Sequence, residues 1–194
     1  MTGLSKIFIK FSGICGLILP VVTLLFLLSS IKQVPWFDLI KYAISDLGRP
    51  EGAADFFNYG IILSGVLLLV FSLGLLRYLD DKAGPTTLGL SAIFFIGIGF
   101  FPVPDPNHTM LSSLFFIGFL LSFFIIGVSL YMRLSHFVSR MGVFALIIAG
   151  VSMCTPLFLL FYEGIAIPEL LIVIPGFFWC MVMGFYMVVG RDTT

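Results

Sequence analysis

Long apolar runs, separated by short polar segments, repeat along the whole chain. Six of them are each close to the roughly 20 residues that an α-helix needs to cross a bilayer. They extend over approximately 8–30, 54–79, 85–101, 108–132, 137–162 and 167–189, and the third is the shortest. We therefore predict an all-α fold, a polytopic membrane protein in which residues 1–194 form a single bundle of six transmembrane helices.

The segment between the first two runs does not fit this simple pattern. The stretch Trp36–Asn58 is long for a turn, and it mixes apolar residues with Asp38, Lys41 and Asp46. Such a mixture suits a short helix that lies at a membrane surface or dips into it. The sequence thus predicts an interfacial or re-entrant segment between spans one and two.

Composition supports the membrane assignment. Of the 194 residues, 60% are hydrophobic and 10% are charged, whereas soluble domains carry about 25% charged residues. The net charge is zero, which argues against nucleic acid as a partner. Cys15, Cys154 and Cys180 each lie within an apolar run, so we interpret them as packing residues rather than disulfides or metal ligands.

The distribution of basic residues predicts the orientation. With the N-terminus in the cytoplasm, the inner side receives seven Lys and Arg residues and the outer side three, as the positive-inside rule favours. The inner residues are Lys6, Lys10, Arg77, Lys82, Arg133, Arg140 and Arg191, and the outer ones are Lys32, Lys41 and Arg49. We expect a multi-pass protein of the cytoplasmic (plasma) membrane with both termini in the cytoplasm.

Acidic residues and prolines gather on the opposite, outer side. Asp38, Asp46, Glu51, Asp55, Asp105, Glu163 and Glu169 all fall there. Pro50, Pro106 and Pro168 stand near the starts of spans two, four and six, where a missing N–H costs no hydrogen bond. Pro156 and Pro175 would bend their helices in the outer half, which can open a cavity there. The alternative is ordinary kinking with tight packing, since proline is common in membrane helices.

Three outer residues are the candidates for chemistry: Asp46, Asp105 and His108. Asp105 and His108 are three positions apart, so on one helical face they could share a proton or a metal ion. One His and two Asp would also suit a divalent cation, although the spacing is far less specific than His-Glu-x-x-His. The alternative is structural: the two Asp side chains cap a turn and a helix, and His108 only lies at the interface.

Other outer polar groups could bind a ligand beside these three. They are Ser45, Tyr42, Asn58, Tyr162 and Glu163. For the tyrosines, the alternative is a role as simple anchors in the membrane interface.

The sequence resembles a known family at these positions. Ile44-Ser45-Asp46-Leu47-Gly48, followed by Phe101-Pro102 with Asp105 and His108, is similar to the prokaryotic domain-of-unknown-function family nine-nine-eight. Ile-Ser-Asp-x-Gly with Pro50-Glu51 and Phe56-Phe57 also resembles the eukaryotic FRAG/DRAM/SFK six-span group, where Thr is common at the position of Leu47. The resemblance implies a six-span membrane protein, and some members of the wider group act in membrane-lipid remodelling. It implies no catalytic assignment.

Together these patterns predict a polar, acid-lined pocket in the outer leaflet, partly covered by the 36–44 segment. We expect it to bind a membrane lipid or another amphiphile, with a divalent cation as a candidate cofactor. If the protein is an enzyme, it would be a lipid-directed hydrolase or transferase, with His108 as general base or metal ligand and Asp46 or Asp105 orienting it. The alternatives are a small-solute transporter or channel, and a non-catalytic membrane scaffold or regulator.

Overall fold

The computed structural model describes residues 3–50, 53–133 and 135–190. Glu51, Arg191 and Asp192 lie outside the described residues. The six long helices are α1 (Gly3–Gln33), α2 (Ala54–Tyr78), α3 (Ala83–Phe100), α4 (His108–Tyr131), α5 (His136–Cys154) and α6 (Ala166–Val189). Two short 3-10 helices accompany them, η1 (Ile44–Gly48) and η2 (Thr155–Leu160).

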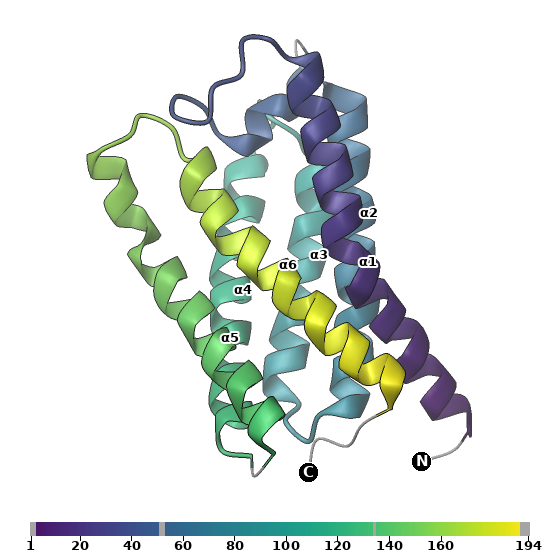
Figure 1. The fold of residues 1–194 in the computed structure, drawn as a ribbon. Coiled ribbons are helices and arrows are strands. Elements are labelled where there is room, and N and C mark those ends of the chain that lie inside the picture. The colour runs from purple at the N-terminus through teal and green to yellow at the C-terminus, as the bar shows by residue number, and fades with distance from the viewer. Residues whose placement is uncertain (1–2, 51–52, 134, 191–194) are drawn as a thin grey trace.

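All six long helices have the length and composition of membrane spans, and the described ranges contain no strand. The predicted all-α six-span bundle is confirmed. Each helix packs against the next along the chain, and α6 packs extensively against α1, which closes the bundle (Figure 1). The start of α1 and the end of α6 lie at one end of the bundle, and η1 lies at the other (Figure 1).

Small residues bring α1 and α6 into close contact. A Cβ atom added to Gly13 would lie 2.7 Å from the carbonyl oxygen of Gly184, and one on Gly184 would overlap the Gly13 carbonyl. In a membrane, where van der Waals packing rather than the hydrophobic effect holds helices together, glycines permit this approach. The crossing fixes the direction in which α6 runs toward η1.

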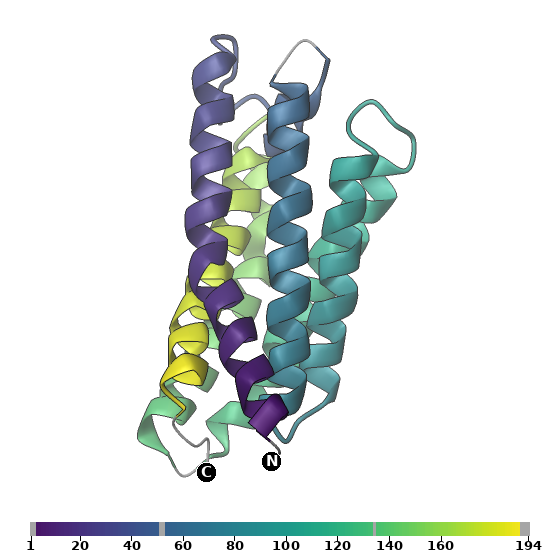
Figure 2. The ribbon, with the colours of Figure 1, turned by 90° about the vertical axis from the view of Figure 1, so that its right-hand side faces the viewer.

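The segment between α1 and α2 differs from the short interfacial helix that we predicted. Residues 34–43 form turns and bends, and only Ile44–Gly48 is helical, as η1. Leu47 is fully buried, and Asp46 and Gly48 are buried beside it. Residues 34–50 are called the covering loop below. They pass over one end of the bundle, at the same end as the α3–α4 connection (Figure 2), and Leu47 fixes them to a small hydrophobic cluster there.

The end of the fifth span and the cap of the fourth helix also differ from the prediction. The fifth span does not continue to Tyr162 as one α-helix, since α5 ends at Cys154 and η2 follows. Pro156 stands in the first turn of η2, where its missing N–H interrupts the α-helical hydrogen bonds. The fourth helix begins at His108 with Asn107 as N-cap, so Asp105 precedes the helix instead of capping it.

Candidate functional site

The larger of two adjoining cavities lies beneath the covering loop, between η1, α4 and α6. It has a volume of about 630 Å³ and is open on one side. Its polar wall includes Ser45, Asp46, Arg49, His108, Ser112 and Glu169. Phe116, Ile117 and Ile172 are among its apolar lining residues. The cavity is therefore amphipathic, with its charged groups gathered near η1.

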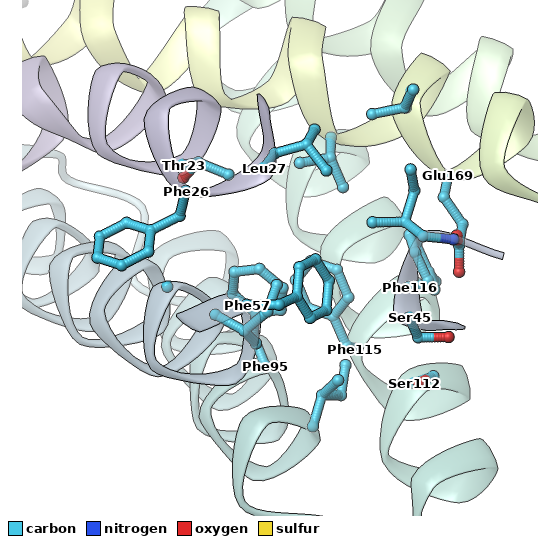
Figure 3. A pocket seen from close by; sticks show the side chains of 16 residues that line it. Thr23, Phe26, Leu27, Ser45, Phe57, Phe95, Ser112, Phe115, Phe116 and Glu169 are labelled. Carbon is cyan, nitrogen blue, oxygen red and sulfur yellow. The ribbon is translucent and has the colours of Figure 1, made fainter. Parts of the chain in front are cut away.

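A second, smaller cavity of about 80 Å³ continues from the first into the bundle. Ser45, Ser112, Phe116 and Glu169 line both cavities. Figure 3 shows Ser45, Ser112 and Glu169 on one side of this smaller cavity, with the rings of Phe57, Phe95 and Phe115 beyond them. The polar groups thus form the boundary between an amphipathic outer chamber and an apolar inner one.

Asp46 holds the covering loop and also faces the outer cavity. Its Oδ2 accepts a hydrogen bond of 2.9 Å from the Ala43 N–H, and its Oδ1 pairs with Arg49 Nη2 at 2.8 Å. This is the turn-capping role expected of Asp next to a tight turn. Because the Asp46 side chain is 12% exposed and that of Arg49 is 48% exposed, the ion pair lies at the mouth of the cavity.

His108 is the first residue of α4 and is buried. Its Nδ1 lies 2.9 Å from the carbonyl oxygen of Phe101, and a carbonyl can only accept, so Nδ1 carries a proton. Its Nε2 lies 3.3 Å from Ser112 Oγ, one helical turn further along α4. In the neutral ring Nε2 is therefore the acceptor, and it is oriented by a backbone carbonyl rather than by Asp46 or Asp105.

Glu169, in the first turn of α6, is the site residue that the sequence analysis missed. Its Oε2 accepts a hydrogen bond of 2.8 Å from the Ile44 N–H, at the start of η1. The same side chain lines both cavities. From the sequence it was one more acidic residue beside a proline, and nothing in that pattern shows that it points into the bundle.

Asp105 does not join the other two predicted catalytic residues. Its Oδ1 accepts hydrogen bonds from the backbone N–H of Asn107 at 2.8 Å and from the Asn107 Nδ2 at 3.0 Å, and it is absent from the lining of both cavities. Within the described ranges no three His, Cys, Asp or Glu side chains are grouped closely enough to hold a metal ion. The structure thus does not group Asp46, Asp105 and His108 as the predicted metal site requires, because the Asp105 side chain closes its own turn.

Of the predicted ligand-binding residues, Ser45 lines both cavities. Asn58 holds the end of η1, because its Nδ2 donates a hydrogen bond of 3.2 Å to the Gly48 carbonyl. Tyr42 packs on Trp36 within the covering loop, with ring centroids 5.1 Å apart. Tyr162 stacks on Phe158 and is exposed, as is Glu163. None of these four lines a cavity.

Ser112 and Arg49 are further lining residues that the sequence analysis did not select. Ser112 could have been found, because it is four residues from His108 and residues with this spacing share a helix face. Arg49 was counted only for its effect on orientation. Its position beside Asp46 depends on η1, which the sequence did not predict as a 3-10 helix.

These features define a class of protein: a six-helix membrane bundle with an amphipathic cavity at one end, beneath the covering loop. The chain belongs to the family described as "Protein of unknown function (DUF998)", whose model matches residues 14–186. That range includes every residue named above as lining a cavity. No curated protein and no solved structure matches the sequence. The similarity to the FRAG/DRAM/SFK group stays a prediction.

Proposed function

We propose that the protein binds a membrane lipid or another amphiphile, with the polar head beside η1 and the apolar part along α4 and α6. The observation that carries this proposal is the amphipathic cavity, which places Asp46, His108 and Glu169 next to an apolar wall. Its volume of about 630 Å³ is within the range of about 300–1,000 Å³ common for small-molecule sites. That volume suits a headgroup with the first part of a chain.

The packing below the cavities favours a closed binding site over a channel. Phe95 and Phe115, which line the inner chamber, stack with ring centroids 4.4 Å apart. Deeper in the core, Phe123 and Trp179 are fully buried and in contact, with ring centroids 5.2 Å apart. The transporter or channel alternative would require these rings to separate. The scaffold alternative accounts for Asp46 holding the loop but leaves the cavity unexplained.

From the positive-inside bias we further propose that the covering loop, and with it the cavity, lies on the outer side of the cytoplasmic membrane. In this orientation an amphiphile would reach the cavity from the outer leaflet. Leu157, Leu160 and Phe161, at the same end of the bundle, have exposed fractions of 58–79%. Exposed apolar side chains of this kind suit contact with lipid rather than water.

Mass spectrometry of the purified protein tests this function. The protein would be extracted in a neutral detergent, exchanged until free lipid is lost, and analysed for lipids that remain. We expect one amphiphile class to be retained at near-stoichiometric amounts, and a variant with a filled cavity to lose it. A folded protein that retains no amphiphile, and takes none up from mixed vesicles, would contradict the proposal.

A second candidate function is cleavage or transfer of an ester in the bound amphiphile. The observation that favours it is the 3.3 Å distance between Ser112 Oγ and His108 Nε2 on the cavity wall. A serine beside a neutral histidine that is oriented by a third group is the arrangement of an activated nucleophile. Here the third group is the Phe101 carbonyl.

The corresponding chemistry would use only these groups and water. Ser112 Oγ would bond to the ester carbonyl carbon while its proton moves to His108 Nε2. The C–O bond to the leaving alcohol would then break, and the alcohol would take that proton. Water, or a second alcohol, would release the acyl group from Ser112 by the same steps in reverse.

A further inference from the structure

The charges that line the outer cavity do not balance. Asp46 and Arg49 form an ion pair at 2.8 Å, so together they contribute no net charge. His108 donates through Nδ1 to a carbonyl and is satisfied as a neutral ring. Glu169 is then the remaining ionisable group among the lining residues. When it is ionised, the cavity carries one net negative charge.

The Glu169 carboxylate is held in position by one oxygen, and its other oxygen can accept a further hydrogen bond. Its Oε2 is held by the Ile44 N–H at 2.8 Å, and neither ion pair found in the described part of the chain includes it. No buried side-chain oxygen in the described ranges lacks a hydrogen-bond partner, so the second carboxylate oxygen is accessible from the cavity. A carboxylate inside a membrane protein is costly unless cationic or polar groups pair with it, and the Ile44 N–H pairs with only one of the two oxygens of Glu169. In the described structure that place beside Glu169 is open to a ligand.

Resting on the binding function proposed above, we infer that the cavity selects amphiphiles whose head carries an ammonium group, with Glu169 as its counter-ion. The low dielectric between α4 and α6 strengthens such a pair relative to water. Phe116 lines the same two chambers as Glu169, and an aromatic ring also attracts an alkylammonium ion. The ammonium could belong to a zwitterionic phospholipid or to a singly charged amine.

An anionic head is disfavoured by the same arrangement. A carboxylate or phosphate monoester without an amine would face Glu169, and the ion pair with Asp46 offsets the positive charge of Arg49. Like charges in a low-dielectric site repel strongly. The sign of the headgroup charge is therefore the property on which the site discriminates.

Probes that share one alkyl chain and differ in the head would test this inference. The protein would be placed in nanodiscs of a neutral glycolipid. Binding would then be measured for tetradecyltrimethylammonium, tetradecylphosphocholine, tetradecanol and tetradecanoate. Glu169→Gln removes the charge but keeps an oxygen for the Ile44 N–H, so η1 stays anchored. Glu163→Gln is the matched control. Glu163 is exposed, and the substitution removes the same charge on the same side of the membrane.

We expect the wild type to bind the ammonium probe at least about tenfold more tightly than the carboxylate, as one charge-assisted contact would give. Glu169→Gln should lose about that factor for the ammonium probe and leave tetradecanol unchanged, while Glu163→Gln behaves as wild type. Comparing the variants cancels the partitioning of each probe into the nanodisc. Binding of phosphocholine as well as trimethylammonium would identify a zwitterionic phospholipid head as an accepted source of the ammonium.

Equal affinity for all four heads, or a preference for ammonium that Glu169→Gln leaves intact, would overturn the inference while amphiphile binding itself stands. Absence of binding for every probe, tetradecanol included, would overturn the proposed function together with the inference. A melting temperature for Glu169→Gln that matches the wild type shows that the variant is folded.

Discussion

The carboxylate of Glu169 in α6 accepts a hydrogen bond from the backbone N–H of Ile44 in η1, 125 positions earlier in the chain. Two backbone hydrogen bonds reinforce this contact, because the N–H groups of Gly164 and Ala166 donate to carbonyls of the covering loop at 2.8 and 3.0 Å. The loop that joins α1 to α2 is thus attached to the start of α6. Glu169 also lines the cavity, so one side chain both anchors the loop and faces the space in which we propose that a ligand binds.

Replacing Glu169 by Ala should therefore destabilise the covering loop. The Ile44 N–H loses its acceptor in a partly buried position, which costs about 1–3 kcal/mol. We expect a lower melting temperature in detergent, and faster tryptic cleavage after Lys41. Glu169→Gln should stay close to the wild type in both measurements, because its amide oxygen still accepts. Equal stability of the Ala and Gln variants would show that the hydrogen bond contributes nothing.

Asp46 combines a hydrogen bond with an ion pair, and two substitutions separate them. Asp46→Asn keeps an oxygen for the Ala43 N–H and loses the charge that pairs with Arg49. Asp46→Ala loses both. The pair with a half-exposed arginine is worth at most about 1 kcal/mol. We therefore expect Asp46→Ala to lower the free energy of unfolding more than Asp46→Asn does. The difference between the two unfolding free energies should be about 1 kcal/mol, and a larger loss for Asn than for Ala would contradict this division.

The contact between α1 and α6 should be sensitive to a single methyl group. In Gly13→Ala the new Cβ would meet the Gly184 carbonyl and the Met187 and Val188 side chains within 3.1 Å. Overpacking of this kind costs about 1–3 kcal/mol, so the melting temperature should fall. Gly150→Ala is the matched control, because a Cβ there has no neighbour within 4 Å and Ala favours a helix. It should be neutral or slightly stabilising.

The fold could be predicted from the sequence because the length of an apolar run identifies a membrane span. A run of about 20 apolar residues has few structures open to it in a bilayer, and α2 and α4 begin at Ala54 and His108 as predicted. The predicted end of α5 was wrong because the apolar run continues through Thr155–Leu160, while the hydrogen bonding there changes from α-helical to 3-10. Apolar composition sets where a chain crosses, not which helix type it adopts.

The site was harder to predict because it depends on where each helix begins and where each side chain points, and composition gives neither. Asp105 and His108 would share a helix face only if the helix included both, and α4 begins at His108. Asp46 and His108 do line one cavity. Glu169 became part of it because the close approach of Gly13 and Gly184 sets the path of α6, and such a pairing of distant residues leaves no signal in a single sequence.

Filling the cavity should remove the amphiphile without unfolding the protein. Ile172 is 7% exposed and lines the outer cavity, so Ile172→Trp would place a larger side chain in space that the ligand needs. We expect retained amphiphile to fall several-fold, measured by mass spectrometry against protein amount. Ile147→Trp, at a site on α5 that is 55% exposed, is the matched control and should keep the wild-type level. Retention by both variants would place the amphiphile elsewhere.

The pairing of Ser112 with His108 makes the last prediction, which concerns reactivity. An alkyl fluorophosphonate modifies only serines whose hydroxyl is activated by a base. We expect labelling at Ser112, detected by peptide mass spectrometry. It should be lost in Ser112→Ala and slowed by about 100-fold or more in His108→Ala, as removal of a general base generally causes.

The neighbouring Ser113 provides the control for this experiment. Its hydroxyl donates to the Thr109 carbonyl at 2.8 Å, as serines in helices commonly do, although it lines the same cavity. Ser113→Ala should therefore be labelled like the wild type. If Ser112 stays unmodified in a folded, amphiphile-binding protein, its contact with His108 only satisfies a buried ring nitrogen. Ester cleavage would then be discarded and the binding function retained.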